Sequence, residues 1–271
     1  AGSALLPPLH RPIQETESIV IRFVGDSGDG MQLTGSDFAR VMGRSGHDFA
    51  THPDYPPEIS APTGTLFGVS GFQIQLASDH ALTSGDKPDL LVVMNPAALA
   101  TNLSDAKAGA TLIVNSGAFS SGNLEKAGYV GNPLEDGSLD DYRLFAVDMS
   151  GLTAQALANS GLGKKEIGRC KNYFALGLML SLFGESPEQQ IEDIRSKFGS
   201  NNPQGSEANI SALRAGYAYG DATEIVAPDY NVPQAHLAPG KYRIVSGNQA
   251  AALGFVAASE RSAVPLFLGS Y

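Results

Sequence analysis

Short apolar runs separated by helix-length segments dominate the first 160 residues of the chain. The clearest runs lie at 18–24, 90–94, 111–114 and 143–147 and are mostly aliphatic. Continuous runs of this length are typical of strands covered on both faces, and three segments that follow such runs, 31–44, 97–103 and 151–158, have helical composition. The pattern therefore predicts an α/β fold, a three-layer α/β/α sandwich around a mostly parallel sheet.

Two further segments of this half do not follow that pattern of apolar runs and helix-length segments. Segment 67–77 alternates around Phe72, Ile74 and Leu76, which predicts a strand with one face buried. Segment 51–64 contains four prolines, and since proline cannot donate to a ladder, we expect a loop there.

The second half is helical at first and then changes character. Segment 164–183 is apolar on more than one side, which predicts an inner helix. An amphipathic helix is predicted to begin at Pro187, and segment 206–219 predicts one more helix. Beyond the linker we expect a short strand, a helix and a second strand, the beginning of another βαβ unit. The predicted organisation is an arm at 1–17, a domain at 18–220, a linker at 221–241 and the start of a second domain at 242–271.

Composition narrows the class of protein. With 271 residues and 42% hydrophobic content the chain can bury a full core, and its net charge of −10 opposes a general attraction to nucleic acid or to an anionic membrane. No apolar run approaches the roughly 18 residues that a membrane helix needs, and the N-terminal residues do not resemble a secretory signal. The single cysteine, Cys170, excludes an internal disulfide and indicates a reducing cytoplasm, so an iron–sulfur cluster would lie on another subunit.

The sequence GDSGDG, at 25–30, follows the first predicted strand and precedes a predicted helix. Gly25 and Gly30 have P-loop spacing, but Met31 and Gln32 stand where lysine and serine or threonine are required. The glycines at 25, 28 and 30 also reverse the order of the dinucleotide fingerprint. Standard NTP hydrolysis and NAD binding are therefore not supported.

A phosphate-bearing ligand still fits this loop. Glycines permit a close backbone approach, and a helix N-terminus offers unpaired N–H groups to an anion. The alternative is that Asp26 and Asp29 cap the helix while the glycines only make the turn.

A basic group precedes and begins the predicted inner helix. Lys164, Lys165, Arg169 and Lys171 are followed by Asn172, a combination that can neutralise phosphates and hold a polar ligand. The alternative is an ordinary solvated face. The five histidines are scattered without metal-binding spacing, and no nucleophile motif is present.

Four stretches together resemble the alpha subunit of the 2-oxoacid:ferredoxin oxidoreductases, in particular the 2-oxoglutarate type. In order along nearly the whole chain they are IRFVGDSGDGMQLTG, THPDYPPEISAPTGTLFGVSGFQIQLAS, RCKNYFALGL and SGNQAAALGFVAA. The resemblance implies that residues 18–220 form the gamma domain, a Rossmann-like module associated with coenzyme A. It also implies that the pyrimidine-binding thiamine diphosphate domain begins near Tyr242.

This family implies an activity for the whole enzyme. Such enzymes decarboxylate a 2-oxoacid on thiamine diphosphate with Mg²⁺, pass electrons through [4Fe-4S] clusters to ferredoxin and transfer the acyl group to coenzyme A. For the 2-oxoglutarate type the product is succinyl-CoA. This chain would contribute coenzyme A binding and no catalytic side chain, with the other cofactors on other domains or subunits.

The resemblance also implies contact residues for coenzyme A. From the loop these are Gly25, Ser27, Gly28, Asp29, Gly30, Met31 and Gln32, against the phosphates, and from the inner helix they are Lys171 and Asn172. We add Asn95 from topology, because it follows the 90–94 strand at an edge where open α/β sheets place ligands.

One departure from the family concerns the end of the sequence. The family's alpha subunit continues through a complete thiamine domain, whereas this sequence ends at Tyr271. We expect as partners a beta subunit, the remainder of the alpha subunit and ferredoxin. Alternatives are a structural assembly module of an enzyme for another 2-oxoacid, such as pyruvate or a branched-chain acid, and an independent nucleotide-dependent oxidoreductase.

Overall fold

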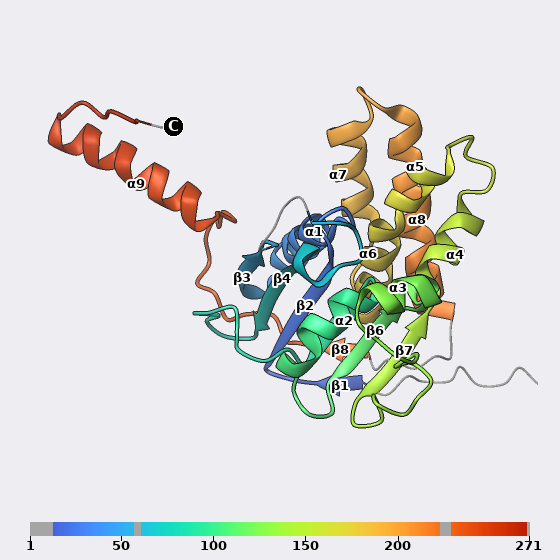
Figure 1. Ribbon diagram of the computed structural model, residues 1–271. Helices are drawn as coiled ribbons and strands as arrows, with labels where there is room; N and C mark the ends of the chain where they lie inside the picture. Colours follow the sequence, from blue (N-terminus) through green and yellow to red (C-terminus); the bar gives the residue numbers. More distant parts are fainter. Residues whose placement is uncertain (1–12, 57–60, 223–228, 270–271) are drawn as a thin grey trace, which may run out of the picture. The chain divides into compact units, whose positions relative to one another are not determined.

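The computed structural model describes residues 13–56, 61–222 and 229–269, and the chain divides into two compact units, Ala1–His236 and Leu237–Tyr271 (Figure 1). The first unit contains a six-stranded sheet in the order β3-β4-β2-β5-β6-β7. Its strands are β2 (Ser18–Asp26), β3 (Asp48–Asp54), β4 (Val69–Ala77), β5 (Leu90–Val93), β6 (Thr111–Asn115) and β7 (Arg143–Val147). Strands β2, β5, β6 and β7 are parallel and β4 runs antiparallel to both of its neighbours, so the prediction of a mostly parallel sheet is confirmed.

Helices cover both faces of this sheet. They are α1 (Met31–Arg44), α2 (Pro96–Asn102), α3 (Ser121–Lys126), α4 (Met149–Ala156), α5 (Lys164–Arg169), α6 (Lys171–Leu182), α7 (Glu188–Phe198) and α8 (Pro203–Ala222), with short 3-10 turns η1 (Leu66–Gly68), η2 (Leu103–Asp105) and η3 (Ser116–Ala118). Figure 1 shows α2 and α3 apart from the group formed by α1, α6, α7 and α8.

Alternating strand residues divide the interior into two hydrophobic clusters. Phe23 and Val92 belong to the cluster that includes residues of α1, α6, α7 and α8, whereas Val24 and Val93 belong to the cluster of α2 and α3. Because neighbouring residues on a strand face opposite ways, each parallel strand contributes to both clusters. This confirms the three-layer sandwich.

Glycine allows α6 and α8 to approach closely. A Cβ atom built on Gly177 would lie 2.0 Å from the carbonyl oxygen of Leu213, and one on Gly216 would lie 2.0 Å from that of Phe174. These two positions exclude larger side chains, and α6, which is buried on nearly every side, is the inner helix that the sequence predicts.

Two predictions about the first half are corrected. Residues 51–54 of the expected loop belong to β3, and Pro53 is accommodated because β3 is an edge strand that pairs only with β4. Residues 57–60 of that expected loop lie outside the described residues. Strand β4 is buried on both faces rather than one, because α1 and α2, which belong to different hydrophobic clusters, both contact it.

Two predictions about the second half also change. The expected helix 164–183 is two helices, since Cys170 separates α5 from α6. The segment expected to be a linker contains β8 (Asp229–Asn231), which pairs in parallel with β1 (Ile13–Glu15) from the expected N-terminal arm. Both strands are short, and neither contains the kind of apolar run that predicts β2, β5, β6 and β7.

The second unit, described by itself, consists of helix α9 (Gly247–Ser262) with extended segments on either side. The helix was predicted, and Ser246 and Gln249 form a capping box at its start. The two flanking strands were predicted wrongly, because between 237 and 269 the structure has no strand for them to pair with. Its apolar side chains are exposed, among them Phe255 and Leu253.

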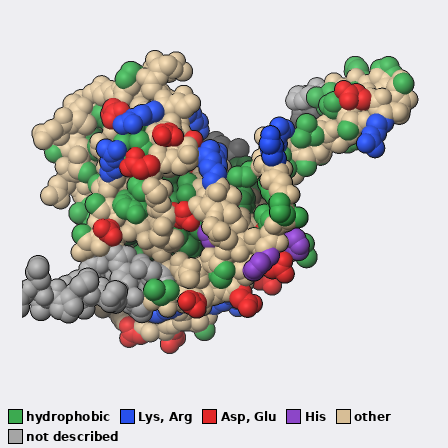
Figure 2. Space-filling model, turned by 180° about the vertical axis from the view of Figure 1, so that it is seen from behind, with side chains coloured by type: hydrophobic (Ala, Val, Ile, Leu, Met, Phe, Trp, Pro, Cys, Tyr) green, Lys and Arg blue, Asp and Glu red, His purple; other side chains and the backbone are tan. Residues whose placement is uncertain are grey.

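Among the described residues no helix is long and apolar enough to span a membrane. Acidic and basic side chains lie interspersed on the surface seen in Figure 2.

Candidate functional site at the carboxyl ends of two central strands

Strands β2 and β5 lie side by side, and the chain leaves them in opposite directions. After β2 it passes through α1 to β3 and β4, and after β5 through α2 to β6 and β7. Such a reversal of strand order opens a crevice at the carboxyl ends of the two strands, where open α/β sheets bind ligands. The glycine loop follows β2 at this position, and Asn95 follows β5.

The glycine loop folds back on the end of β2. The backbone N–H of Asp29 donates to the carbonyl of Asp26 at 2.8 Å, and the N–H of Asp26 donates to Oδ2 of Asp29 at 3.0 Å. A Cβ on Gly25 would lie 3.0 Å from atoms of Asp29, so this close return requires glycine or a shifted carboxylate. The N–H of Ser27 donates to the carbonyl of Gly68, while Gly28 is exposed with open space around it.

Gly30 joins the loop to α1 in a left-handed conformation, with φ of 76°. A Cβ at this residue would lie 2.7 Å from Nδ2 of Asn172, which is itself buried. Asn172 therefore packs against the bend. Its amide oxygen accepts from the N–H of Tyr173, so the side chain buttresses the loop rather than facing a cavity.

Asp29 links three segments that are far apart in the sequence. Its Oδ1 lies 2.8 Å from Nζ of Lys171, and its Oδ2 accepts a hydrogen bond of 3.0 Å from the amide of Asn95. The oxygen of that same amide accepts from the N–H of Ala98 and caps α2. The structure thus brings together three of the predicted contact residues by direct contact.

Asp26 lies beside this group and is not fully satisfied. It is 6% exposed; its Oδ2 accepts from the N–H of Gly64 at 2.8 Å, whereas its Oδ1 has no hydrogen-bond partner among the described residues. Burial raises the pKa of Asp26 above its ordinary 3.8, and the carboxylate of Asp29 adds to the shift, while the groups of Gly64, Asn95 and Lys171 oppose it. The alternative that Asp26 and Asp29 cap the helix is wrong, since Gly30 occupies the N-cap and no side chain caps α1.

Two predicted contact residues have their side chains engaged elsewhere. Met31 is 1% exposed and belongs to the hydrophobic core. Gln32 donates from Nε2 to the carbonyl oxygens of Asp54 and Gly71 and so ties α1 to β3 and β4. Only their backbone N–H groups remain for a ligand, and in the described part of the chain these two and that of Leu33 have no acceptor, as is usual in a first helical turn.

A cavity of about 160 Å³ opens beside the loop, at the strand ends. Five of the residues already discussed line it, namely Asp26, Asp29, Gly64, Asn95 and Lys171, and they are joined by Thr63, Met94, Pro96, Ala118, Asn123 and Lys126. Gly25, Ser27, Gly28, Gly30, Met31, Gln32 and Asn172 are not among its lining residues.

The basic group expected at the inner helix divides in two. Only Lys171 reaches the cavity, while Lys164, Lys165 and Arg169 are exposed on α5. Sequence reasoning missed Lys126, which ends a six-residue helix that showed no clear apolar period. It also missed Thr63 and Gly64, whose only signal was their place in the distinctive proline-rich stretch.

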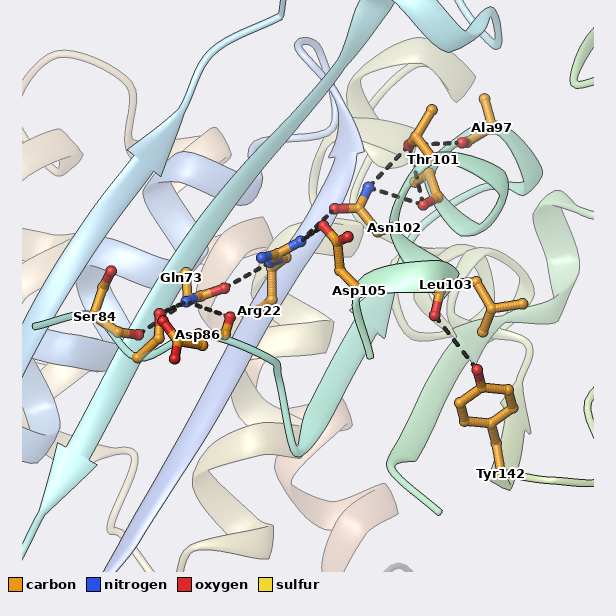
Figure 3. Close-up of polar contacts among 12 residues, drawn as sticks. Arg22, Gln73, Ser84, Asp86, Ala97, Thr101, Asn102, Leu103, Asp105 and Tyr142 are labelled. Atoms are coloured by element: carbon orange, nitrogen blue, oxygen red, sulfur yellow. Dashed lines mark hydrogen bonds and ion pairs between the residues drawn. The ribbon is translucent and has the colours of Figure 1, made fainter. Parts of the chain in front are cut away.

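A second, larger cavity of about 490 Å³ lies over one face of β2, β3 and β4 and shares no lining residue with the first. Arg22, Gln73 and His52 occupy one cross-strand row of that face. The guanidinium of Arg22 donates to the amide oxygens of Gln73 and Asn102 and pairs with Asp105 at 2.8 Å (Figure 3). This network fastens η2 and the loop at 84–86 to the sheet.

No group of three or more His, Cys, Asp or Glu side chains suited to a metal ion occurs in the part of the chain that the structure describes. Cys170 is buried, and burial beside Glu166 raises the pKa of its thiol, so it is not an activated nucleophile. The site can bind and position a ligand with its amides, carboxylates and lysines.

Comparison with known proteins relates this chain to a protein family and to a curated relative. A family model described as pyruvate ferredoxin/flavodoxin oxidoreductase matches residues 20–219. The 2-oxoglutarate oxidoreductase subunit KorA of Mycobacterium tuberculosis is 51% identical over 258 residues, which is 95% of this chain and 39% of that protein. The chain thus spans about 39% of the length of the curated relative that it matches.

Two solved structures share the fold. A 2-oxoglutarate:ferredoxin oxidoreductase from Magnetococcus marinus, with 2-oxoglutarate, coenzyme A and succinyl-CoA bound, matches with a TM-score of 0.62 and 22% identity, over 82% of this chain and 34% of that one. The gamma subunit of a keto/oxoacid ferredoxin oxidoreductase from Geobacter sulfurreducens matches with a TM-score of 0.51 and 21% identity, over 76% of this chain and 99% of that one.

Proposed function

The chain belongs to the pyruvate ferredoxin/flavodoxin oxidoreductase family, and from this premise we propose that it is the coenzyme A-binding part of a 2-oxoglutarate:ferredoxin oxidoreductase. The complete enzyme would oxidatively decarboxylate 2-oxoglutarate, form succinyl-CoA and reduce ferredoxin. The 51% identity to a 2-oxoglutarate oxidoreductase subunit supports this substrate above pyruvate or a branched-chain acid.

The observation that carries the coenzyme role is the cavity at the carboxyl ends of β2 and β5. It lies at a reversal of strand order, and it is lined by Asn95 and Lys171 together with Asp29, which contacts both of them. These features fit the polar tail of a nucleotide-bearing coenzyme. Coenzyme A supplies a thiol that accepts the acyl group, and this chain would hold the coenzyme so that the thiol is positioned for transfer.

Thiamine diphosphate, Mg²⁺ and [4Fe-4S] clusters would lie on the remainder of the alpha subunit and on a beta subunit. Ferredoxin would meet the assembled enzyme, with no role for nucleic acid or membrane. A cytoplasmic location fits the single cysteine of this sequence.

The test is a calorimetric titration of the assembled enzyme with coenzyme A, performed on the wild type and on Ala118→Leu. Ala118 lines the cavity, so the larger side chain fills it, whereas Ala156→Leu on the exposed surface of α4 is the matched control. We expect weaker binding only in Ala118→Leu. Equal affinity in all three proteins would place the coenzyme elsewhere, and loss of assembly in Ala118→Leu would favour a purely structural module.

A further inference from the structure

The charges around the cavity do not all cancel in pairs. Two carboxylates and two ammonium groups line it. Asp29 and Lys171 neutralise one another at 2.8 Å. The carboxylate of Asp26 and the ammonium of Lys126 remain, and neither has an ion-pair partner within the described residues.

One carboxylate oxygen of Asp26 lacks a hydrogen-bond donor among the residues that the structure describes. Its Oδ1 is buried without a partner, and an unpaired buried acceptor is costly, especially on an ionised group. Because this oxygen is shielded from solvent, only a group that enters the cavity and moves the side chains around it slightly can reach it. An O–H or N–H group would satisfy Asp26, whereas a phosphate would be repelled.

Lys126, in contrast to Asp26, can bind an anionic group. It is exposed at the end of α3 and approaches Gly64, whose Cβ position lies 3.7 Å from Cδ of Lys126. Its long stem lets the ammonium group move over the cavity, and a lysine in this setting is a point charge for a phosphate. A ligand that matches both residues carries an anionic group and a hydrogen-bond donor close together.

We propose that the cavity binds a phosphate ester of coenzyme A together with the hydroxyl group next to it, Lys126 pairing with the phosphate and Asp26 accepting from the hydroxyl. This rests on the proposed function and assigns the contacts within it. A volume of about 160 Å³ holds one such group and not the whole coenzyme. Coenzyme A offers this combination twice, on the ribose that carries the 3′-phosphate and on the phosphopantetheine arm.

The first arm of the test removes the cation. In the assembled enzyme, Lys126→Met should weaken coenzyme A binding about 5- to 10-fold, with the difference shrinking as salt is added. Lys165→Met is the matched control, since Lys165 is an exposed lysine that does not line the cavity, and its affinity should stay at the wild-type value. Equal losses in both variants, or no loss in Lys126→Met, would overturn the proposal.

The second arm removes the carboxylate, and the direction of the change in affinity distinguishes a bound hydroxyl from a bound phosphate. Asp26→Asn should weaken binding about 10-fold, because its amide oxygen accepts from Gly64 and its amide nitrogen can only donate to the ligand hydroxyl, a neutral hydrogen bond in place of one to a carboxylate. If a phosphate itself occupied this position, removal of the negative charge would tighten binding. Unchanged or tighter binding therefore overturns the proposal, with Asp79→Asn, an exposed carboxylate, as control. The variant should fold, since it removes an uncompensated buried charge.

The third arm identifies the ester. Adenosine 3′,5′-diphosphate and 4′-phosphopantetheine are titrated separately, and the proposal requires that one of them lose affinity in both variants. If neither does, the proposal fails while coenzyme A binding by the wild type stands. If the wild type binds no coenzyme A at all, the proposed function fails and this assignment with it.

Discussion

Gly30→Ala tests the geometry on which the site depends. Gly30 has φ of 76°, and an alanine in this left-handed region costs about 1–2 kcal/mol. The new Cβ would also lie 2.7 Å from Nδ2 of Asn172, which is 5% exposed and has little room to move. Together these terms predict a loss of about 2 kcal/mol in the free energy of unfolding.

The assay is thermal unfolding of the purified protein, with Gly28→Ala as the matched control. Gly28 lies in the same loop, but a Cβ there meets nothing within 4 Å and its φ is not positive, so its stability should change by less than about 0.5 kcal/mol. A loss of about 2 kcal/mol corresponds to a fall in Tm of roughly 4–8 °C for Gly30→Ala. Coinciding unfolding curves for the two variants would refute the reasoning, because Asn172 would then not pack against a left-handed Gly30.

Three other variants test the charge, the polar network and the helix packing. Asp26→Asn should be about 1–2 kcal/mol more stable than wild type at pH 7, because the pKa of Asp26 is raised in the folded state and its charge costs stability above that pKa. The advantage of the variant should vanish as the pH falls toward 3.8, the ordinary pKa of the group. A stability difference that is independent of pH would contradict the assignment. Arg22→Met should lower the free energy of unfolding in urea by about 2–5 kcal/mol, since it leaves the buried amide oxygens of Gln73 and Asn102 without a donor. A loss below about 1 kcal/mol would show that the network is dispensable. Gly216→Ala should cost about 1–3 kcal/mol, because its Cβ would lie 2.0 Å from a backbone carbonyl of α6, and an unchanged Tm would mean that the two helices do not pack as described.

The central part of the fold could be predicted from local patterns. Strands β5 and β6 are short aliphatic runs, and α1 begins and ends at the predicted residues Met31 and Arg44. Strand β3 could not be predicted, because Pro53 argues against a strand unless its position at the edge of the sheet is known. Strand β8 shows the same limit, since three residues carry no periodicity and gain their structure only by pairing with β1.

The candidate site was predictable in its location and only partly in its contacts. A polar residue after each of two parallel strands places Asp29 and Asn95 at one sheet edge by topology alone. The ion pair between Asp29 and Lys171 needed the inner helix to be positioned against the loop, which no local pattern specifies. Lys126 could not be predicted as a site residue, because its helix is short and an isolated lysine usually lies on a solvated surface.

Hydrogen exchange of the assembled enzyme with and without coenzyme A tests the central claim most directly. Saturating coenzyme A should slow exchange in peptides covering 25–33 and in those covering 94–98, the two strand ends that border the cavity. The exposed helix α5, which carries the remaining basic residues, should exchange at an unchanged rate. Protection confined to α5, or none at either strand end while coenzyme A is bound, would contradict the account.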